Sequence, residues 1–182
     1  MKGPLAGLVV FDLTRILAGP HCTQILGDLG AEIVKVERPK VGDDTRNFAP
    51  PYLPDAAGKD TAESAYFAGT NRNKRSITLN LGDPEGQAIA RRMIAKSDIL
   101  AENFKTGTLA KYGLGYEDLR GEFPRLIYCS VTGFGHTGPY SDRPAYDALI
   151  QAMGGLMHTC GSAELGRPRR SHARRCSSAQ RW

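Results

Sequence analysis

Residues 8–38, LVVFDLTRILAGPHCTQILGDLGAEIVKVER, predict a strand, a helix and a second strand in one short stretch. The apolar run 8–11 is typical of a buried strand. Residues 20–29 fit a helix that ends at Gly30, because glycine readily adopts the left-handed conformation found after helices. Residues 31–37 are β-branched and apolar at alternate positions, which is typical of a strand. The pattern therefore predicts a βαβ unit with two parallel strands.

The alternation of strands and helices continues along the chain. Further strands are expected at 76–81, 99–102 and 126–131, and helices at 83–96 and 146–153. Asp83 followed by Pro84 is a typical helix start, because aspartate caps free amide groups and proline suits the first turn. Residues 39–64 are rich in proline, glycine and aspartate, and we expect a long loop there. The sequence thus predicts an α/β fold with a largely parallel sheet.

The net charge of +5 comes from one end of the 182-residue chain. Six of the 24 basic residues are arginines between 167 and 181, which leaves 18 basic against 19 acidic residues. We therefore expect no nucleic-acid-binding surface on the rest of the protein. No apolar run reaches the roughly 20 residues of a membrane span, and Asp12 interrupts the N-terminal apolar stretch, which argues against a signal peptide. The four cysteines are scattered, so reduced thiols and a cytoplasmic location are expected.

The composition of the sequence changes after Gly161. Residues 162–182 have no apolar periodicity and are rich in arginine and serine, so we expect a disordered tail after a folded segment at 1–161. A basic interaction tail is one interpretation. A shifted reading frame or similar truncation is the other, and it is favoured because misread GC-rich codons give text rich in Arg, Ser, Ala and Pro.

Four stretches combine polar or glycine residues with cations next to strand ends. They are residues 12–20, 37–39, 71–75, and 102–105 with Lys111. Ligands of open α/β sheets lie beyond the carboxyl ends of the strands, and guanidinium groups bind phosphates with two parallel hydrogen bonds. A phosphorylated ligand is therefore one interpretation. Solvated loop charges are the other, since none of these four stretches contains a Walker or GxGxxG motif.

Other polar residues have more ordinary explanations. His136 lies in a glycine-rich loop and is expected to be structural or solvated. Asp147 lies early in a predicted helix, where an acid favours the helix dipole. Tyr146 could be a core aromatic residue or a ligand contact. No Ser-His-Asp order or metal-ligand spacing is present, so no metal site is expected.

Four ordered motifs carry a resemblance to a known family. They are PLAGLVVFDLTRILAGPHCTQILGDLGAEIVKVERPKVGDDTR (4–46), YFAGTNRNKRSITLNL (66–81), DILAENFKTGTLAKYGLGYEDL (98–119) and PRLIYCSVTGFGHTGPYSDRPAYDALIQAMGGLMHTCG (124–161). In these the chain resembles the N-terminal part of the family III CoA-transferases, the CaiB/BaiF type. The most similar subgroup moves CoA between dicarboxylic acids, such as succinate and glutarate, or between formate and oxalate.

The resemblance implies the N-terminal half of a Rossmann-like large domain, in a chain of roughly 400 residues. It also implies an interlocked homodimer, acyl-CoA and carboxylic acid substrates, and no cofactor other than CoA as a substrate. The implied CoA contacts are Leu17, Ala18, Arg38, Leu79, Asn80, Leu81, Gly82, Asn103, Phe104, Lys105, Lys111 and Tyr146.

The implied catalytic group is an aspartate roughly thirty residues after the tyrosine, which forms a covalent acyl intermediate. That position falls near Cys176, and no aspartate follows Asp147, itself only a weak candidate. We therefore expect a truncated, inactive chain whose parent moves CoA from an acyl-CoA to a free acid. A non-catalytic CoA-binding module is the alternative. A 2-methylacyl-CoA racemase is a weaker one, because racemases carry a histidine at the place of Tyr146.

Overall fold

A computed structural model of the protein describes residues 3–159. The arginine-rich segment 162–182 and Cys176 lie outside the described residues. The chain divides into two units, Met1–Val131 and Thr132–Trp182. No helix within the described part of the chain is long and apolar enough to cross a membrane.

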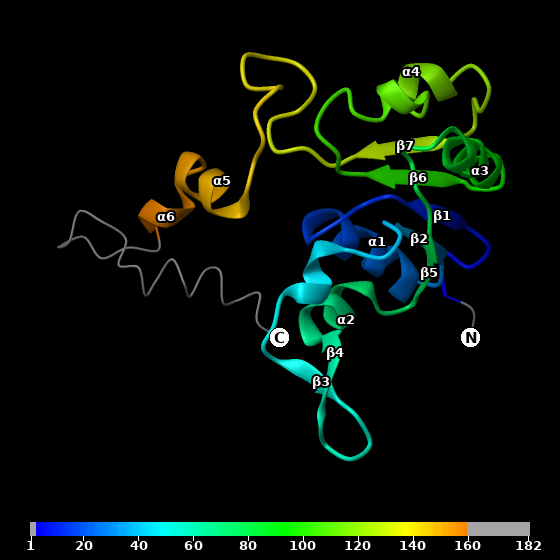
Figure 1. The fold of residues 1–182 in the computed structure, drawn as a ribbon. Helices are drawn as coiled ribbons and strands as arrows, with labels where there is room; N and C mark the ends of the chain where they lie inside the picture. Colours follow the sequence, from blue (N-terminus) through cyan, green and yellow to red (C-terminus); the bar gives the residue numbers. More distant parts are fainter. Residues whose placement is uncertain (1–2, 160–182) are drawn as a thin grey trace. The chain divides into compact units, whose positions relative to one another are not determined.

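The first unit is built on a sheet of five parallel strands, β1 (Val9–Asp12), β2 (Glu32–Glu37), β5 (Lys74–Thr78), β6 (Ile99–Glu102) and β7 (Ile127–Ser130). Their order across the sheet is β5-β2-β1-β6-β7 (Figure 1). In chain order this is 3-2-1-4-5, the order of a Rossmann sheet. The predicted α/β fold with a Rossmann-like parallel sheet is therefore confirmed.

Helices and short 3₁₀ turns lie between the parallel strands along the chain. The helices are α1 (Ala18–Asp28), α2 (Ala65–Asn71), α3 (Pro84–Ile94) and α4 (Tyr116–Leu119), with the 3₁₀ turns η1 (Asp44–Asn47) and η2 (Ala110–Tyr112). The expected helix start before α3 is confirmed, because the Asp83 carboxylate accepts a hydrogen bond from the Glu85 amide at 2.9 Å. Gly30 follows α1 with φ of 103°, as expected of a glycine that ends a helix.

Two apolar cores lie on opposite faces of the sheet, because successive side chains of a strand point to opposite sides. Phe11 and Leu100 belong to the larger core, which includes Ile94 of α3. Val10 and Ile33 belong to the smaller core, against which Leu26 of α1 packs. Burying each of these large apolar side chains stabilises the fold by about 2 kcal/mol.

The expected loop at 39–64 is only partly correct. It contains η1 and an antiparallel hairpin of β3 (Tyr52–Pro54) and β4 (Asp60–Ser64). Figure 1 shows this hairpin projecting beyond α2, away from the five-stranded sheet. Its strands are short and largely exposed, and β4 is polar, so they lack the apolar alternation by which strands are recognised.

The strand expected at 76–81 is shifted. β5 covers Lys74–Thr78 because its residues pair in order with Ile33–Glu37 of β2. The chain leaves the sheet at Leu79 and turns through Asn80–Asp83, where the Asp83 amide donates to the Asn80 carbonyl at 3.2 Å.

The second unit contains α5 (Asp147–Met153) and α6 (Leu156–Thr159) after a glycine-rich loop. The helix expected at 146–153 is confirmed, with Tyr146 as its N-cap. Within the loop, Phe134 and Tyr140 make an edge-to-face contact with ring centroids 5.6 Å apart.

Candidate functional site

The loops after β1 and β6 meet where the strand order reverses. Asn103 joins them, because its side chain accepts from the Arg15 amide at 2.8 Å and donates to the Arg15 carbonyl at 2.7 Å. The Arg15 guanidinium lies 5.2 Å from the centre of the Phe104 ring. This switch point is where open α/β sheets bind their ligands, and two of the sequence-predicted residues, Asn103 and Phe104, lie there, directly after β6.

A buried carboxylate holds the first turn after β1. Asp12 is fully buried, and its Oδ1 accepts from the Thr14 amide at 2.9 Å and the Thr14 hydroxyl at 2.5 Å. Its Oδ2 accepts from the Thr23 hydroxyl at 2.6 Å and from Lys74 Nζ at 3.1 Å. The acid therefore ties the end of β1 to α1 and to the start of β5.

Lys74 completes this cluster from β5, which is separated from β1 by β2 in the sheet. Its ammonium donates to the Pro20 carbonyl at 2.8 Å, to the Thr23 hydroxyl at 2.8 Å and to Asn71 Oδ1 at 3.1 Å. Burial lowers the pKa of Lys74, although the Asp12 charge partly opposes this. Since its donors are all directed inward, Lys74 is a structural cation and does not face a ligand.

A second buried ion pair supports the turn that leads into α1. The Lys35 ammonium and the Asp43 carboxylate lie 2.9 Å apart, and both side chains are fully buried. Lys35 also donates to the Thr14 carbonyl at 2.9 Å, and both Asp43 oxygens lie 3.3 Å from the Ile16 amide. Ile16 has φ of 71°, which is strained for a β-branched residue and needs such support.

The charges around Asp43 keep it ionised. Burial alone would raise the pKa of Asp43, but the Lys35 charge and hydrogen bonds from Thr45 lower it overall. A carboxylate of this kind persists inside a protein because its charge and its oxygens are all satisfied.

Glu37 anchors η1 to the end of β2. Arg46 donates to its two oxygens at 2.7 and 2.8 Å, and the Asp43 amide donates to Oε2 at 2.9 Å. Burial would raise the pKa of Glu37, but the bonds from Arg46 and Ser76 outweigh it and lower the pKa to about 2. The Arg46 guanidinium also lies 3.7 Å from the centre of the Phe67 ring, so its donors and its face are both engaged.

An open cavity of about 260 Å³ lies beyond the ends of β2 and β5. Its lining residues are Glu37, Arg38, Lys40, Val41, Gly42, Arg46, Ser76 and Thr78. Because Arg46 is held by Glu37, Arg38 and Lys40 are the exposed cations of this cavity. The Arg38 guanidinium donates to Asp44 Oδ1 at 2.5 Å, and the side chain is 45% exposed. The cavity can receive an anionic group such as a phosphate.

The other predicted contacts lie on the same edge of the sheet or near it. Leu17 and Ala18 begin α1, directly after the supported turn. Leu79 is buried in the larger core, and Leu81 packs partly against that core. Asn80 accepts from the Gly82 amide at 3.1 Å and shapes the turn between them. Lys105 and Lys111 are exposed.

Tyr146 and Asp147 belong to the second unit. The Tyr146 side chain is 72% exposed. Asp147 lies in the first turn of α5, and its carboxylate accepts a hydrogen bond from the side-chain amide of Gln151 at 2.6 Å. This is the helix-start role expected from the sequence for Asp147.

Sequence reasoning missed the residues that support the turns. The sequence predicts Lys35 only as part of a strand, and Asp43 and Arg46 only as part of a loop. Lysine flanked by Val34 and Val36 was a usable signal, because a lysine is rarely buried without a partner. Asp44 carried no signal of its own.

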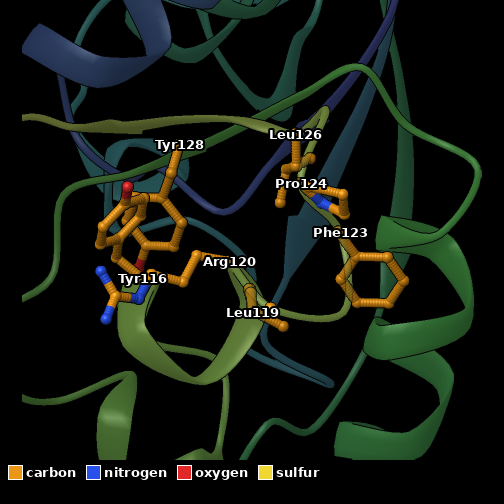
Figure 2. Close-up of a pocket in the computed structure, with 8 residues that line it drawn as sticks. Tyr116, Leu119, Arg120, Phe123, Pro124, Leu126 and Tyr128 are labelled. Atoms are coloured by element: carbon orange, nitrogen blue, oxygen red, sulfur yellow. The ribbon is translucent and has the colours of Figure 1, made fainter.

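A second cavity, of about 400 Å³, is unrelated to these loops (Figure 2). Its lining residues are Tyr116, Leu119, Arg120, Gly121, Phe123, Pro124, Leu126 and Tyr128. Arg120 is its only charged residue and is paired with Glu117 at 2.8 Å. None of the predicted ligand contacts lines it.

Comparison with known proteins matches this architecture. The profile of the family described as CoA-transferase family III matches residues 5–174. The chain is 50% identical over 167 residues to the succinate–glutarate CoA-transferase of Agrobacterium fabrum, covering 92% of this chain and 41% of that protein. It is 51% identical over 158 residues to the succinyl-CoA:glutarate CoA-transferase of Mus musculus, covering 87% of this chain and 35% of that protein.

A solved structure gives the same result for the fold. A CaiB/BaiF family protein from Brucella suis superimposes with a TM-score of 0.83 at 49% identity, over 93% of this chain and 44% of that one. The chain thus spans less than half the length of these relatives. The family profile covers most of the chain, and the high identities extend along almost all of it. The chain belongs to the CoA-transferase family III.

Proposed function

We propose that this chain supplies the CoA-binding part of an enzyme that moves CoA from an acyl-CoA to a free carboxylic acid. The observation that carries the proposal is the pair of exposed cations, Arg38 and Lys40, beside an open cavity at the carboxyl ends of β2 and β5. A phosphorylated nucleotide is the ligand for which a Rossmann sheet and such cations are suited. Dicarboxylic acids are the proposed acceptors, in keeping with the names of the similar enzymes.

The proposed path of CoA starts at this cavity and crosses the switch point of the sheet. Phosphates would lie near Arg38, the turn at 79–82 would face the adenine, and Asn103 and Phe104 would line the path toward the thioester. Asn103 would act mainly through the backbone of Arg15, since both ends of its amide group bind there.

The proposed chemistry is a covalent relay through a carboxylate. The carboxylate attacks the thioester carbonyl, which gives a mixed anhydride and releases the CoA thiolate. The thiolate then attacks the enzyme-derived carbonyl of the anhydride and frees the donor acid. The acceptor acid repeats these steps in reverse. Among the described residues, Asp147 lies in the first turn of α5, where its carboxylate is bonded to Gln151, so we propose that residues 3–159 bind CoA and do not supply the attacking carboxylate.

Titration calorimetry of the chain with CoA tests the proposal. We expect saturable binding that weakens about tenfold or more in Arg38→Ala, because a charge-assisted hydrogen bond is worth about 1.5–3 kcal/mol. Arg75→Ala is the matched control, since Arg75 lies on β5 and pairs with Glu32 at 2.9 Å, away from the cavity.

An assay with succinyl-CoA and glutarate tests whether the chain transfers CoA in addition to binding it. We expect no glutaryl-CoA from the chain alone. Absence of saturable CoA binding would contradict the proposed binding function, and turnover would contradict the proposal that residues 3–159 do not supply the attacking carboxylate. Binding that is equally strong in wild type and Arg38→Ala would show that the cavity is not the phosphate site.

A further inference from the structure

One acidic side chain, Asp44, lies between Arg15 and Arg38 of the candidate site. Asp44 Oδ1 accepts from Arg38 at 2.5 Å, and Asp44 Oδ2 lies 3.9 Å from Arg15 Nη1. Arg15 follows β1 and Arg38 follows β2. One carboxylate therefore forms ion pairs with cations from the ends of two neighbouring strands. Two convergent guanidinium groups are also what a bound phosphate requires.

Residues other than Asp44 stabilise η1. Asp43 is the N-cap of η1, with its side chain accepting from the Thr45 amide at 3.0 Å. The Glu37 carboxylate accepts a hydrogen bond from the Arg46 guanidinium. Both of these acids are almost completely buried, whereas the Asp44 side chain is 40% exposed. Asp44 therefore has a different role from its two acidic neighbours.

The contacts of Asp44 are of a kind that a ligand can replace. Exposed ion pairs contribute little to stability, because water screens the charges. A phosphate carries more charge and more acceptor oxygens than a carboxylate, and it competes well for the same guanidinium groups. An anion that approached Arg38 with Asp44 in place would meet a negative charge beside its own target, which is unfavourable.

We propose that Asp44 occupies the position of a ligand phosphate and competes with it for Arg38 and Arg15. The ligand class is a phosphate ester of a nucleotide. This inference rests on the proposed function and adds to it, because it assigns to Asp44 the role of weakening and selecting phosphate binding. Ligands that present a charged phosphate to Arg38 displace Asp44, and neutral ligands of the same shape do not.

The test measures dissociation constants of the chain and of Asp44→Asn by titration calorimetry. The probes are CoA, dephospho-CoA, which lacks the 3′-phosphate, and adenosine 3′,5′-bisphosphate. Asp44→Asn keeps the side-chain size and removes the charge, so we expect binding of CoA to tighten roughly three- to tenfold. Asp60→Asn is the control, because it removes the same charge from an exposed position in β4.

The three probes distinguish which phosphate displaces Asp44. A gain for CoA and the bisphosphate but not for dephospho-CoA assigns the 3′-phosphate to Arg38. An equal gain for CoA and dephospho-CoA assigns the pyrophosphate instead. Either result supports the competition.

Other results overturn it. Unchanged or weaker CoA binding by Asp44→Asn, with wild-type binding intact, refutes the role of Asp44 and leaves the proposed function standing. An equal gain in Asp60→Asn shows a general charge effect and also refutes it. Failure of all variants to bind any probe overturns the proposed function and this inference together. Thermal unfolding followed by circular dichroism confirms that each variant is folded.

Discussion

Replacement of Lys35 by methionine is predicted to destabilise the protein strongly. The Lys35 ammonium and the Asp43 carboxylate are fully buried, 2.9 Å apart. Lys35→Met leaves Asp43 with hydrogen bonds from Thr45 and Ile16 but without a counter-charge. Removing one partner of a buried ion pair costs about 3–5 kcal/mol, which is a large part of the roughly 5–15 kcal/mol that stabilises a typical domain.

A double-mutant cycle separates the ion pair from its surroundings. Asp43→Asn removes the carboxylate charge and leaves the Lys35 ammonium, which also donates to the Thr14 carbonyl, without a counter-charge. The double variant Lys35→Met/Asp43→Asn contains no buried charge at this place. We therefore expect it to be more stable than the sum of the single losses predicts, by about 1–3 kcal/mol.

The free energies of unfolding are measured in urea at pH 7 by far-ultraviolet circular dichroism. Arg75→Met is the control, because it removes a cation from the same sheet whose side chain is 79% exposed. Losses below about 1 kcal/mol for both single variants, or single losses that simply add, would refute the reasoning. They would mean that the two charges do not depend on one another in the folded chain.

Two further predictions concern Glu37 and the turn before α3. The pKa of Glu37 is about 2 in the folded chain against an ordinary 4.5, so its contribution of about 3 kcal/mol is complete above pH 4.5 and is lost as the pH falls toward 2. Unfolding of Glu37→Gln, followed by urea titration from pH 7 to pH 3, should lack this part of the acid dependence, and an unchanged pH profile would contradict the assignment. A Cβ on Gly86 would lie 1.9 Å from the Asn80 carbonyl oxygen, whereas one on Gly121 would meet nothing within 4 Å. Gly86→Ala should therefore lower the melting temperature and weaken CoA binding by displacing the turn at 79–82, while Gly121→Ala should change neither, and equal effects would refute the packing argument.

Most of the fold could be predicted because its signals are local. The strand at 99–102 and the start of α3 at Asp83 follow from residue type alone, and the structure has both. The exact extent of β5 could not be predicted, since it is set by pairing with β2 and not by its own residues. The β3–β4 hairpin was missed for a related reason, because exposed polar strands carry no burial pattern.

The cations of the candidate site could be predicted from the sequence, but the hydrogen bonds and ion pairs that hold its loops could not. Arg38 and Asn103 follow strands in the sequence, and strand ends are where α/β proteins bind ligands. That Asn103 binds the backbone of Arg15 depends on two loops 88 residues apart in sequence. The role of Asp43 depends likewise on a lysine of a neighbouring strand, and no spacing rule describes such a contact.

One face of the sheet explains why these supports are buried charges. Val10 and Asp12 of β1 point to the same side, as do Ile33, Lys35 and Glu37 of β2, because alternate side chains share a face. That face is apolar under α1, where Val10 and Ile33 pack, and becomes charged toward the carboxyl ends of the strands.

The side chains change from apolar to charged where the backbone leaves the sheet and its polar groups need partners. A turn that leaves a sheet exposes amide and carbonyl groups, and only polar side chains can satisfy them away from water. Asp12, Lys35 and Asp43 do so for the turn at 13–17, including the strained Ile16. A screen for lost CoA binding would therefore find these residues as readily as Arg38. Unfolding measurements distinguish the two groups, because loss of Arg38 should weaken binding at constant stability, whereas loss of Lys35 should reduce both.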